Sequence, residues 1–229
     1  MKDKKKYYLF QMKLSTLNIV SFILLVIVLG ITWLIDKEFL YSSFYDMFSS
    51  FAILMILIFG FMVLHEILHS IAYCIYGGKF NKVVYGIQLE KGVFYCLCKQ
   101  NISKLNVLNS LMFPLFYIGI VTYIIAMIFN EPYLLWLSIF NISGCCGDII
   151  MFIFISRLNK DIEFTELDDS TSFGIYSEED VSKRNHFGLK YIGSCDKVDR
   201  NDLKKIKVSK FSYLVLFIIL VLIIVFNVM

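Results

Sequence analysis

Long, uncharged apolar segments alternate with shorter polar ones along this chain. Five segments are apolar over about 18 residues or more, which is enough for a helix to cross a hydrocarbon core of about 30 Å. These segments are Leu14–Ile35, Met47–Tyr76, Leu105–Phe129, Tyr133–Ile155 and Phe211–Val228. The pattern therefore predicts an all-α integral membrane protein with about five transmembrane helices.

Two polar connections have a pattern of their own. Residues 83–99, between the second and third segments, combine β-branched and aromatic residues with a glycine-containing turn, which predicts a short β-hairpin. Residues 157–210 are polar and mixed. In them we expect a short helix from Ser177 and a short strand over Phe187–Ile192.

Composition and charge agree with a membrane protein. Apolar residues make up 58% of the chain and charged residues 18%, against about 45–50% and about 25% in soluble domains. All but one of the 22 lysines and arginines lie before the first segment, between the second and third, or between the fourth and fifth. The positive-inside rule makes that side cytoplasmic, which puts the N-terminus inside and the C-terminus outside.

The apolar segments define the expected domains, and the positions of the basic residues and cysteines argue against two classes of protein. We expect a membrane-embedded core over residues 1–156, a cytoplasmic segment over residues 157–210 and a C-terminal transmembrane helix over residues 211–229. Basic residues flank apolar segments rather than gathering on a soluble face, which argues against a nucleic-acid partner. The six cysteines form no CxxC pair, so neither a disulfide framework nor a cysteine-based zinc ribbon is expected.

Residues 65–69, inside the second segment, read His-Glu-Ile-Leu-His. Ionisable side chains are costly at membrane depth and need partners, water or a metal. Positions i and i+4 of a helix share a face, so His65 and His69 can bind one ion, and imidazole nitrogens suit zinc. Glu66 can then act as a general base on a metal-activated water. Two alternatives are polar residues that only link helices and a ferritin-like carboxylate site, for which the chain lacks a second Glu-x-x-His.

A catalytic zinc site of this kind needs a third protein ligand. Asp148 is the only acidic residue in the fourth segment, and His69 and Asp148 both lie about seven residues, or about 10 Å at 1.5 Å per residue, from the cytoplasmic ends of their segments. Gly144 and Gly147 nearby indicate either close helix packing or a break that turns Asp148 towards the metal. The other candidates are Cys145, Cys146, Asp168, Asp169 and His186.

These residues resemble the membrane-embedded zinc metalloproteases related to site-2 protease, in which an HExxH helix is followed by an aspartate on a later helix. In this chain the later motif is Asn141-Ile-Ser-Gly-Cys-Cys-Gly-Asp148, without the prolines and the following glycine of that family. The chain is more similar to a small bacterial family of zincin peptidases, with a Gly77-Gly78 pair after HEILH and a Gly147-Asp148 element. The resemblance covers about residues 60–160.

The resemblance implies one zinc ion per chain, held by His65, His69 and Asp148, with Glu66 catalytic. It implies a membrane-associated polypeptide substrate, cut within or next to the bilayer, and a substrate-binding role for Asn141. The hairpin over residues 83–99 is either an edge to which a substrate strand adds or a flap lying at the membrane interface.

Two other functions compete with a zinc endopeptidase. One is a non-enzymatic membrane module, regulatory or for self-immunity, that retains a metal-binding site. The other is an ion or solute carrier, which the absence of a detectable inverted repeat disfavours.

Overall fold

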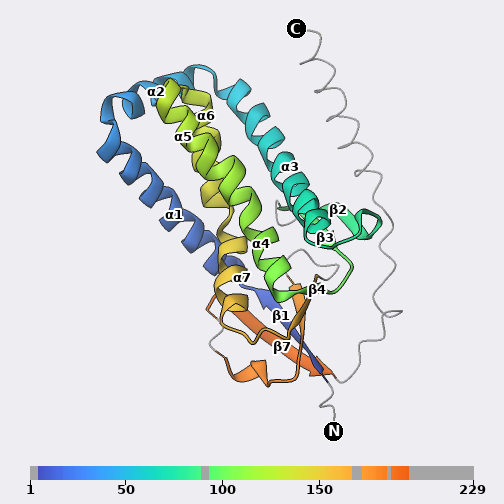
Figure 1. Cartoon of the computed structure of the whole chain (residues 1–229). Coiled ribbons are helices and arrows are strands. Elements are labelled where there is room, and N and C mark those ends of the chain that lie inside the picture. The colour runs from blue at the N-terminus through green and yellow to red at the C-terminus, as the bar shows by residue number, and fades with distance from the viewer. Residues whose placement is uncertain (1–4, 89–92, 167–171, 185–186, 196–229) are drawn as a thin grey trace.

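The structure is a computed structural model that describes residues 5–88, 93–166, 172–184 and 187–195. A bundle of apolar helices stands on a small antiparallel sheet, and a separate hairpin lies beside one helix (Figure 1). The helical elements are α1 (Leu14–Ile35), α2 (Lys37–Ser49), α3 (Phe51–Ile75), α4 (Lys104–Pro114), η2 (Leu115–Val121), α5 (Thr122–Phe129), α6 (Pro132–Gly144) and α7 (Cys146–Ser156).

Three helices in this part of the chain are long and apolar enough to cross a membrane. They are α1, α3 and the continuous helix Lys104–Phe129, which is formed by α4, η2 and α5. The pair α6 and α7 would be a fourth span, bent by 43°. Residues 211–228, the predicted fifth span, lie outside the described residues, so the structure gives three or four candidate spans. The predicted second span began at Met47; it is divided at Ser50 into α2 and α3.

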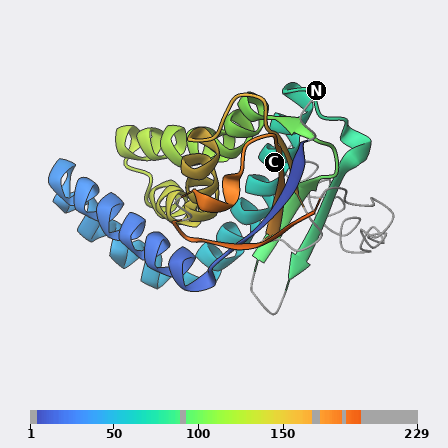
Figure 2. The same ribbon diagram turned by 90° about the horizontal axis from the view of Figure 1, so that it is seen from below.

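The sheet contains five strands in the order β4-β5-β6-β1-β7, and every pairing is antiparallel. Its strands are β1 (Lys6–Met12), β4 (Ile102–Ser103), β5 (Glu163–Glu166), β6 (Ser172–Ser177) and β7 (Leu189–Cys195). The N-terminal strand β1 pairs with both β6 and β7. Residues before the first helix and residues after the fourth apolar segment therefore form one sheet. The sheet lies across the end of the bundle where α1 begins and α7 ends (Figures 1 and 2).

This sheet corrects the prediction of an all-α protein with one hairpin. The described part of the chain is mostly helical but has a second layer of β-structure, to which β1 contributes unexpectedly. The helix expected from Ser177 is absent: Ser177 ends β6, and a short 3-10 turn, η3 (Val181–Lys183), follows. The strand expected over Phe187–Ile192 is present, shifted to β7.

The predicted hairpin consists of β2 (Val83–Gln88) and β3 (Val93–Cys98), after the short helix η1 (Phe80–Lys82). It packs on α3, where the rings of Phe59 and Phe94 meet edge to face with centroids 5.1 Å apart. The Tyr85 hydroxyl also donates a hydrogen bond to Ser70 Oγ. Two side-chain contacts therefore hold the hairpin against the helix that contains HEILH.

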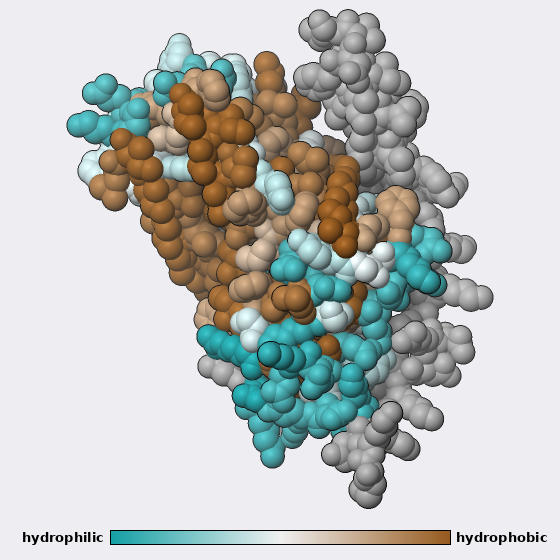
Figure 3. Space-filling model, in the orientation of Figure 1, coloured by the Kyte–Doolittle hydropathy of each residue, from teal (hydrophilic) through white to brown (hydrophobic). Residues whose placement is uncertain are grey.

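Surface hydropathy divides the molecule into two regions. Large apolar side chains are exposed along the helices, for example Phe22 in α1 and Ile56 in α3, which are 64% and 73% exposed. Polar residues gather over the sheet end (Figure 3). Exposed apolar surface on this scale is the mark of a surface that meets lipid or another protein.

A ring cluster joins the sheet to the helices. Phe10 of β1 is fully buried and packs on Phe154 of α7 and on Phe173 and Tyr191 of the neighbouring strands, with centroid distances of 4.9, 5.7 and 5.6 Å. The N-terminal strand therefore anchors the sheet to α7 through aromatic packing.

Phe10→Ala is expected to destabilise the protein by about 3–5 kcal/mol, because the substitution leaves a cavity between sheet and helix. Thermal unfolding in detergent measures the effect. The matched control is Phe22→Ala, whose side chain is 64% exposed and whose loss should cost no more than about 0.5 kcal/mol. Equal losses of Tm in both variants would contradict the anchoring role of β1.

Candidate metal centre

Donor atoms of three residues converge between α3 and α7. His65 Nε2 lies 3.1 Å from His69 Nε2 and 3.3 Å from Asp148 Oδ2, and His69 Nε2 lies 3.4 Å from Asp148 Oδ1. Zinc binds such donors at about 2.0–2.1 Å in a tetrahedron, whose edges are then about 3.3–3.4 Å. The triangle formed by the three residues therefore has the size of one face of a zinc site.

The other ring nitrogens fix the tautomers of both histidines. His69 Nδ1 lies 3.0 Å from the Ser110 carbonyl oxygen, which can only accept, so Nδ1 carries the proton. His65 Nδ1 likewise faces Asn141 Oδ1 at 2.9 Å. Both Nε2 atoms then present lone pairs towards a carboxylate, an arrangement that suits a cation among them. Such outer hydrogen bonds are typical of metal-binding histidines.

A proline leaves free the carbonyl group that accepts a hydrogen bond from His69. Pro114 lies four residues after Ser110 and has no N–H, so the Ser110 carbonyl lacks its usual partner within the helix. The helix continues in π form through η2 after this point, as helices often do at functional sites. The freed carbonyl accepts the His69 N–H instead.

A break in the fourth apolar segment orients Asp148. Helix α6 ends at Gly144 and α7 begins at Cys146, with a bend of 43° between them, so Asp148 lies in the first turn of α7. A Cβ atom added to Gly144 would meet nothing within 4 Å, and at Gly147 only ordinary contacts. Of the two predicted roles for these glycines, the structure favours the break over close packing.

Glu66 lies beside this triangle in a cavity of about 530 Å³. Its carboxylate accepts a hydrogen bond from the main chain of Cys96 in β3. The cavity is lined by α3, β3 and both halves of the bent segment, and Asn141, Tyr73 and Glu166 also face it. A carboxylate held next to the donor triangle, with open space around it, can exchange a proton with a bound molecule.

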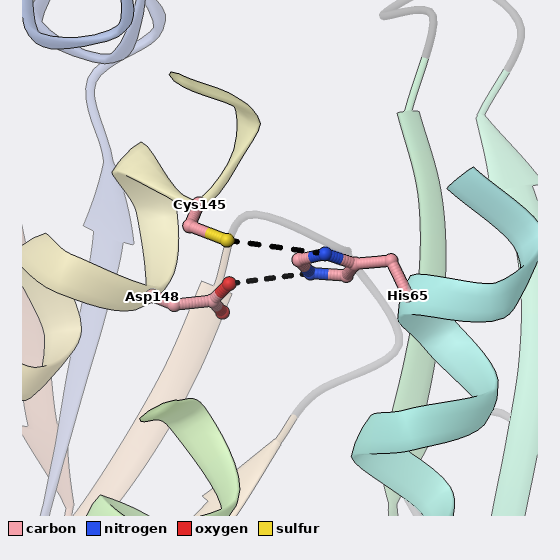
Figure 4. Close-up of side chains that lie close together, drawn as sticks. All are labelled: His65, Cys145 and Asp148. Carbon is pink, nitrogen blue, oxygen red and sulfur yellow. Dashed lines mark hydrogen bonds and ion pairs between the residues drawn. The ribbon is translucent and has the colours of Figure 1, made fainter. Parts of the chain in front are cut away.

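Cys145 is the alternative third ligand that the structure also brings close. Its Sγ lies 3.9 Å from His65 Nδ1, and with His65 and Asp148 it forms a group whose ligand atoms all lie within 4.8 Å. Figure 4 shows the thiol and the carboxylate approaching opposite nitrogens of the ring. The set with His69 is tighter and converges on one nitrogen of each histidine, so it fits a metal better.

Comparison with known families agrees with this centre. Residues 58–162 match the family described as "putative zincin peptidase". This match agrees with the resemblance expected from the sequence, and the family's description indicates a metalloprotease. No curated protein and no solved structure matches the chain, and the more distant similarity to site-2 protease stays an expectation. The zincin-peptidase segment includes the HEILH helix and the Asn141–Asp148 stretch but excludes β1, β5, β6 and β7.

The structure brings together the five site residues expected from the sequence. His65, His69, Asp148, Glu66 and Asn141 all face one cavity. Asn141 hydrogen-bonds His65, a position from which it orients the ring; its substrate-binding role stays a prediction. The other ligand candidates were Cys146, Asp168, Asp169 and His186; Cys146 lines the cavity without joining the triangle, and the other three lie outside the described residues.

Two residues of the cavity were not expected from the sequence. Tyr73 is one helical turn past His69 on the same face, a spacing that could have identified it. Glu166 comes from β5, and no local pattern marks it. Glu166 Oε1 accepts from the Tyr73 hydroxyl and Oε2 from the Cys98 N–H, both at 2.7 Å.

Burial raises the pKa of Glu166 to about 7, although the hydrogen bonds from Tyr73 and Cys98 oppose the shift. Folding thus favours the protonated form, and the stability gained from it is present below the unfolded pKa of 4.5 and is lost as the pH rises to about 7. Glu166→Gln, which cannot ionise, should lack this loss. We expect wild type to lose up to about 3 kcal/mol relative to the variant between pH 4.5 and pH 8, at about 1.4 kcal/mol per pKa unit.

The measurement is the difference in Tm between wild type and Glu166→Gln across that pH range, because other titrations cancel in the difference. Glu163→Gln is the control on the same strand, since Glu163 pairs with Lys5 at the surface. A difference that does not change with pH would contradict the raised pKa.

Proposed function

We propose that this protein is a membrane-embedded zinc endopeptidase that hydrolyses a peptide bond in or near the bilayer. The observation that carries the proposal is the donor triangle of His65, His69 and Asp148, at zinc spacing and with Glu66 beside it. The family match, which indicates a metalloprotease, supports it independently.

The three residues of the triangle would hold one zinc ion, with Asn141 and Ser110 keeping the imidazoles in the required tautomer. When bound, zinc polarises a substrate carbonyl and makes a water molecule a better nucleophile at neutral pH. Three protein ligands leave a fourth position for water or substrate, which distinguishes a catalytic site from a structural one.

Glu66 is the general base of this proposal. Its carboxylate takes a proton from the attacking water and passes it to the nitrogen of the leaving amine. The Cys96 main chain holds one side of the carboxylate, which limits its rotation. Apolar residues of the cavity, among them Phe61 and Leu137, keep bulk water away from the reacting groups.

The exposed apolar helices support a position in the membrane. By the positive-inside rule, the basic residues counted in the sequence support a cytoplasmic position for the sheet, the N-terminus and residues 157–210. The metal centre would then lie a short distance into the bilayer from the cytoplasm, where a membrane-associated polypeptide can reach it. The C-terminus would be extracellular.

Elemental analysis of the purified protein should give about one zinc per chain. Asp148→Ala should lose most of it, because a direct ligand is removed. Asn141→Ala removes only the partner of His65, and should weaken zinc binding by about 10–100-fold. A folded wild type that binds no zinc when zinc is supplied would contradict the proposal.

Glu66→Gln should keep the zinc, because the amide oxygen can still accept from Cys96, but should lower hydrolysis by about 10²–10⁴-fold. Fluorescein-labelled casein, added to the protein in detergent and in lipid vesicles, serves as a general unfolded substrate. Equal turnover in Glu66→Gln and wild type would exclude Glu66 as the base. Equal biological function of the two would favour the non-enzymatic module.

A further inference from the structure

The carboxylate of Glu166 joins three elements that are far apart in the sequence. It projects from β5 of the sheet, accepts the Tyr73 hydroxyl of α3 at 2.7 Å and accepts the Cys98 N–H of β3 at 2.7 Å. Tyr73 is 2% exposed, and both Tyr73 and Glu166 face the cavity of the metal centre. Glu166 lies four residues beyond the segment that matches the family.

The outer edge of β3 is held by two glutamates. The Lys99 N–H donates to the Lys82 carbonyl on the β2 side. Residues alternate along a strand, so the N–H groups of Cys98 and Cys96 both point away from β2. Glu166 accepts a hydrogen bond from the Cys98 N–H. Glu66, the proposed general base, accepts one from the main chain of Cys96.

We propose that Glu166 is a positioning residue that acts through β3 on Glu66. By holding the Cys98 N–H, it fixes where β3 lies along α3, and so keeps the Cys96 N–H on the Glu66 carboxylate. Its second hydrogen bond, from Tyr73, ties this position to the helix that carries both histidines. The catalytic part of this inference rests on the proposed function; the positional part does not.

Loss of Glu166 should act locally. The hairpin keeps the Phe59–Phe94 ring contact and the Tyr85–Ser70 hydrogen bond, which attach other parts of it to α3. The donor triangle contains no atom of β3 or β5, so zinc binding should not change. What changes is the end of β3 at Cys96 and Cys98, and with it the orientation of Glu66.

Hydrogen exchange on the zinc-loaded, full-length protein tests the positional part. In Glu166→Ala, the amides of Cys96 and Cys98 should exchange at least about 10-fold faster than in wild type, with zinc per chain and amides of α1 unchanged. Glu166→Gln keeps one acceptor oxygen and should lie between. Glu163→Gln removes a carboxylate from the same strand, where it binds Lys5 and Asn101, and should match wild type.

Kinetics with labelled casein test the catalytic part. Glu166→Ala should lower kcat by about 10-fold or more with little change in KM, since the base is misplaced while the cavity is kept. Unchanged exchange at Cys96, or a loss of zinc equal to that of Asp148→Ala, would overturn the positioning role. If wild type cleaves no casein, the proposed function fails, and exchange at Cys96 still decides whether Glu166 positions Glu66.

Discussion

Three lone-pair acceptors meet within 3.4 Å of one another inside a bundle of apolar helices, and the surrounding structure is built to keep them there. In such a medium an unpaired charge or lone pair is costly, so the arrangement favours a cation at its centre. Two acceptors, Asn141 Oδ1 and the Ser110 carbonyl oxygen, hold the Nδ1 atoms of the two imidazoles. The protein bends a membrane-length segment by 43° to bring the carboxylate to the same point.

Much of the centre could be predicted because its signals are local in the sequence. Two histidines four residues apart share a helical face, and ionisable residues in an apolar segment need a partner. Asp148 was singled out as the only acidic residue of its segment and by its depth, since His69 and Asp148 lie equally far from the cytoplasmic ends of two segments that run in the same direction. Pro114 can also be seen in the sequence, and it leaves the Ser110 carbonyl free. That this carbonyl accepts the His69 N–H depends on a contact between α3 and α4, which no local pattern reports.

The sheet and its contribution to the cavity could not be predicted in the same way. Strand β1 is seven residues long and pairs with strands more than 160 residues later, so its register depends on the folded chain. The β-structure was underestimated for this reason. Glu166 has no motif around it; its place follows from β5 meeting the end of β3, which is a property of the tertiary structure.

The family segment holds the proposed metal-binding residues and the proposed base but not all that positions them. Phe10 of β1 packs on α7, the helix that begins next to Asp148, and Glu166 of β5 reaches the strand that holds Glu66. Both contacts come from strands of the sheet that lie outside residues 58–162. A displacement of the sheet would therefore move the carboxylate of Asp148 through α7 and the carboxylate of Glu66 through β3. The proposed catalysis would therefore depend on a layer of structure that the motif itself does not contain.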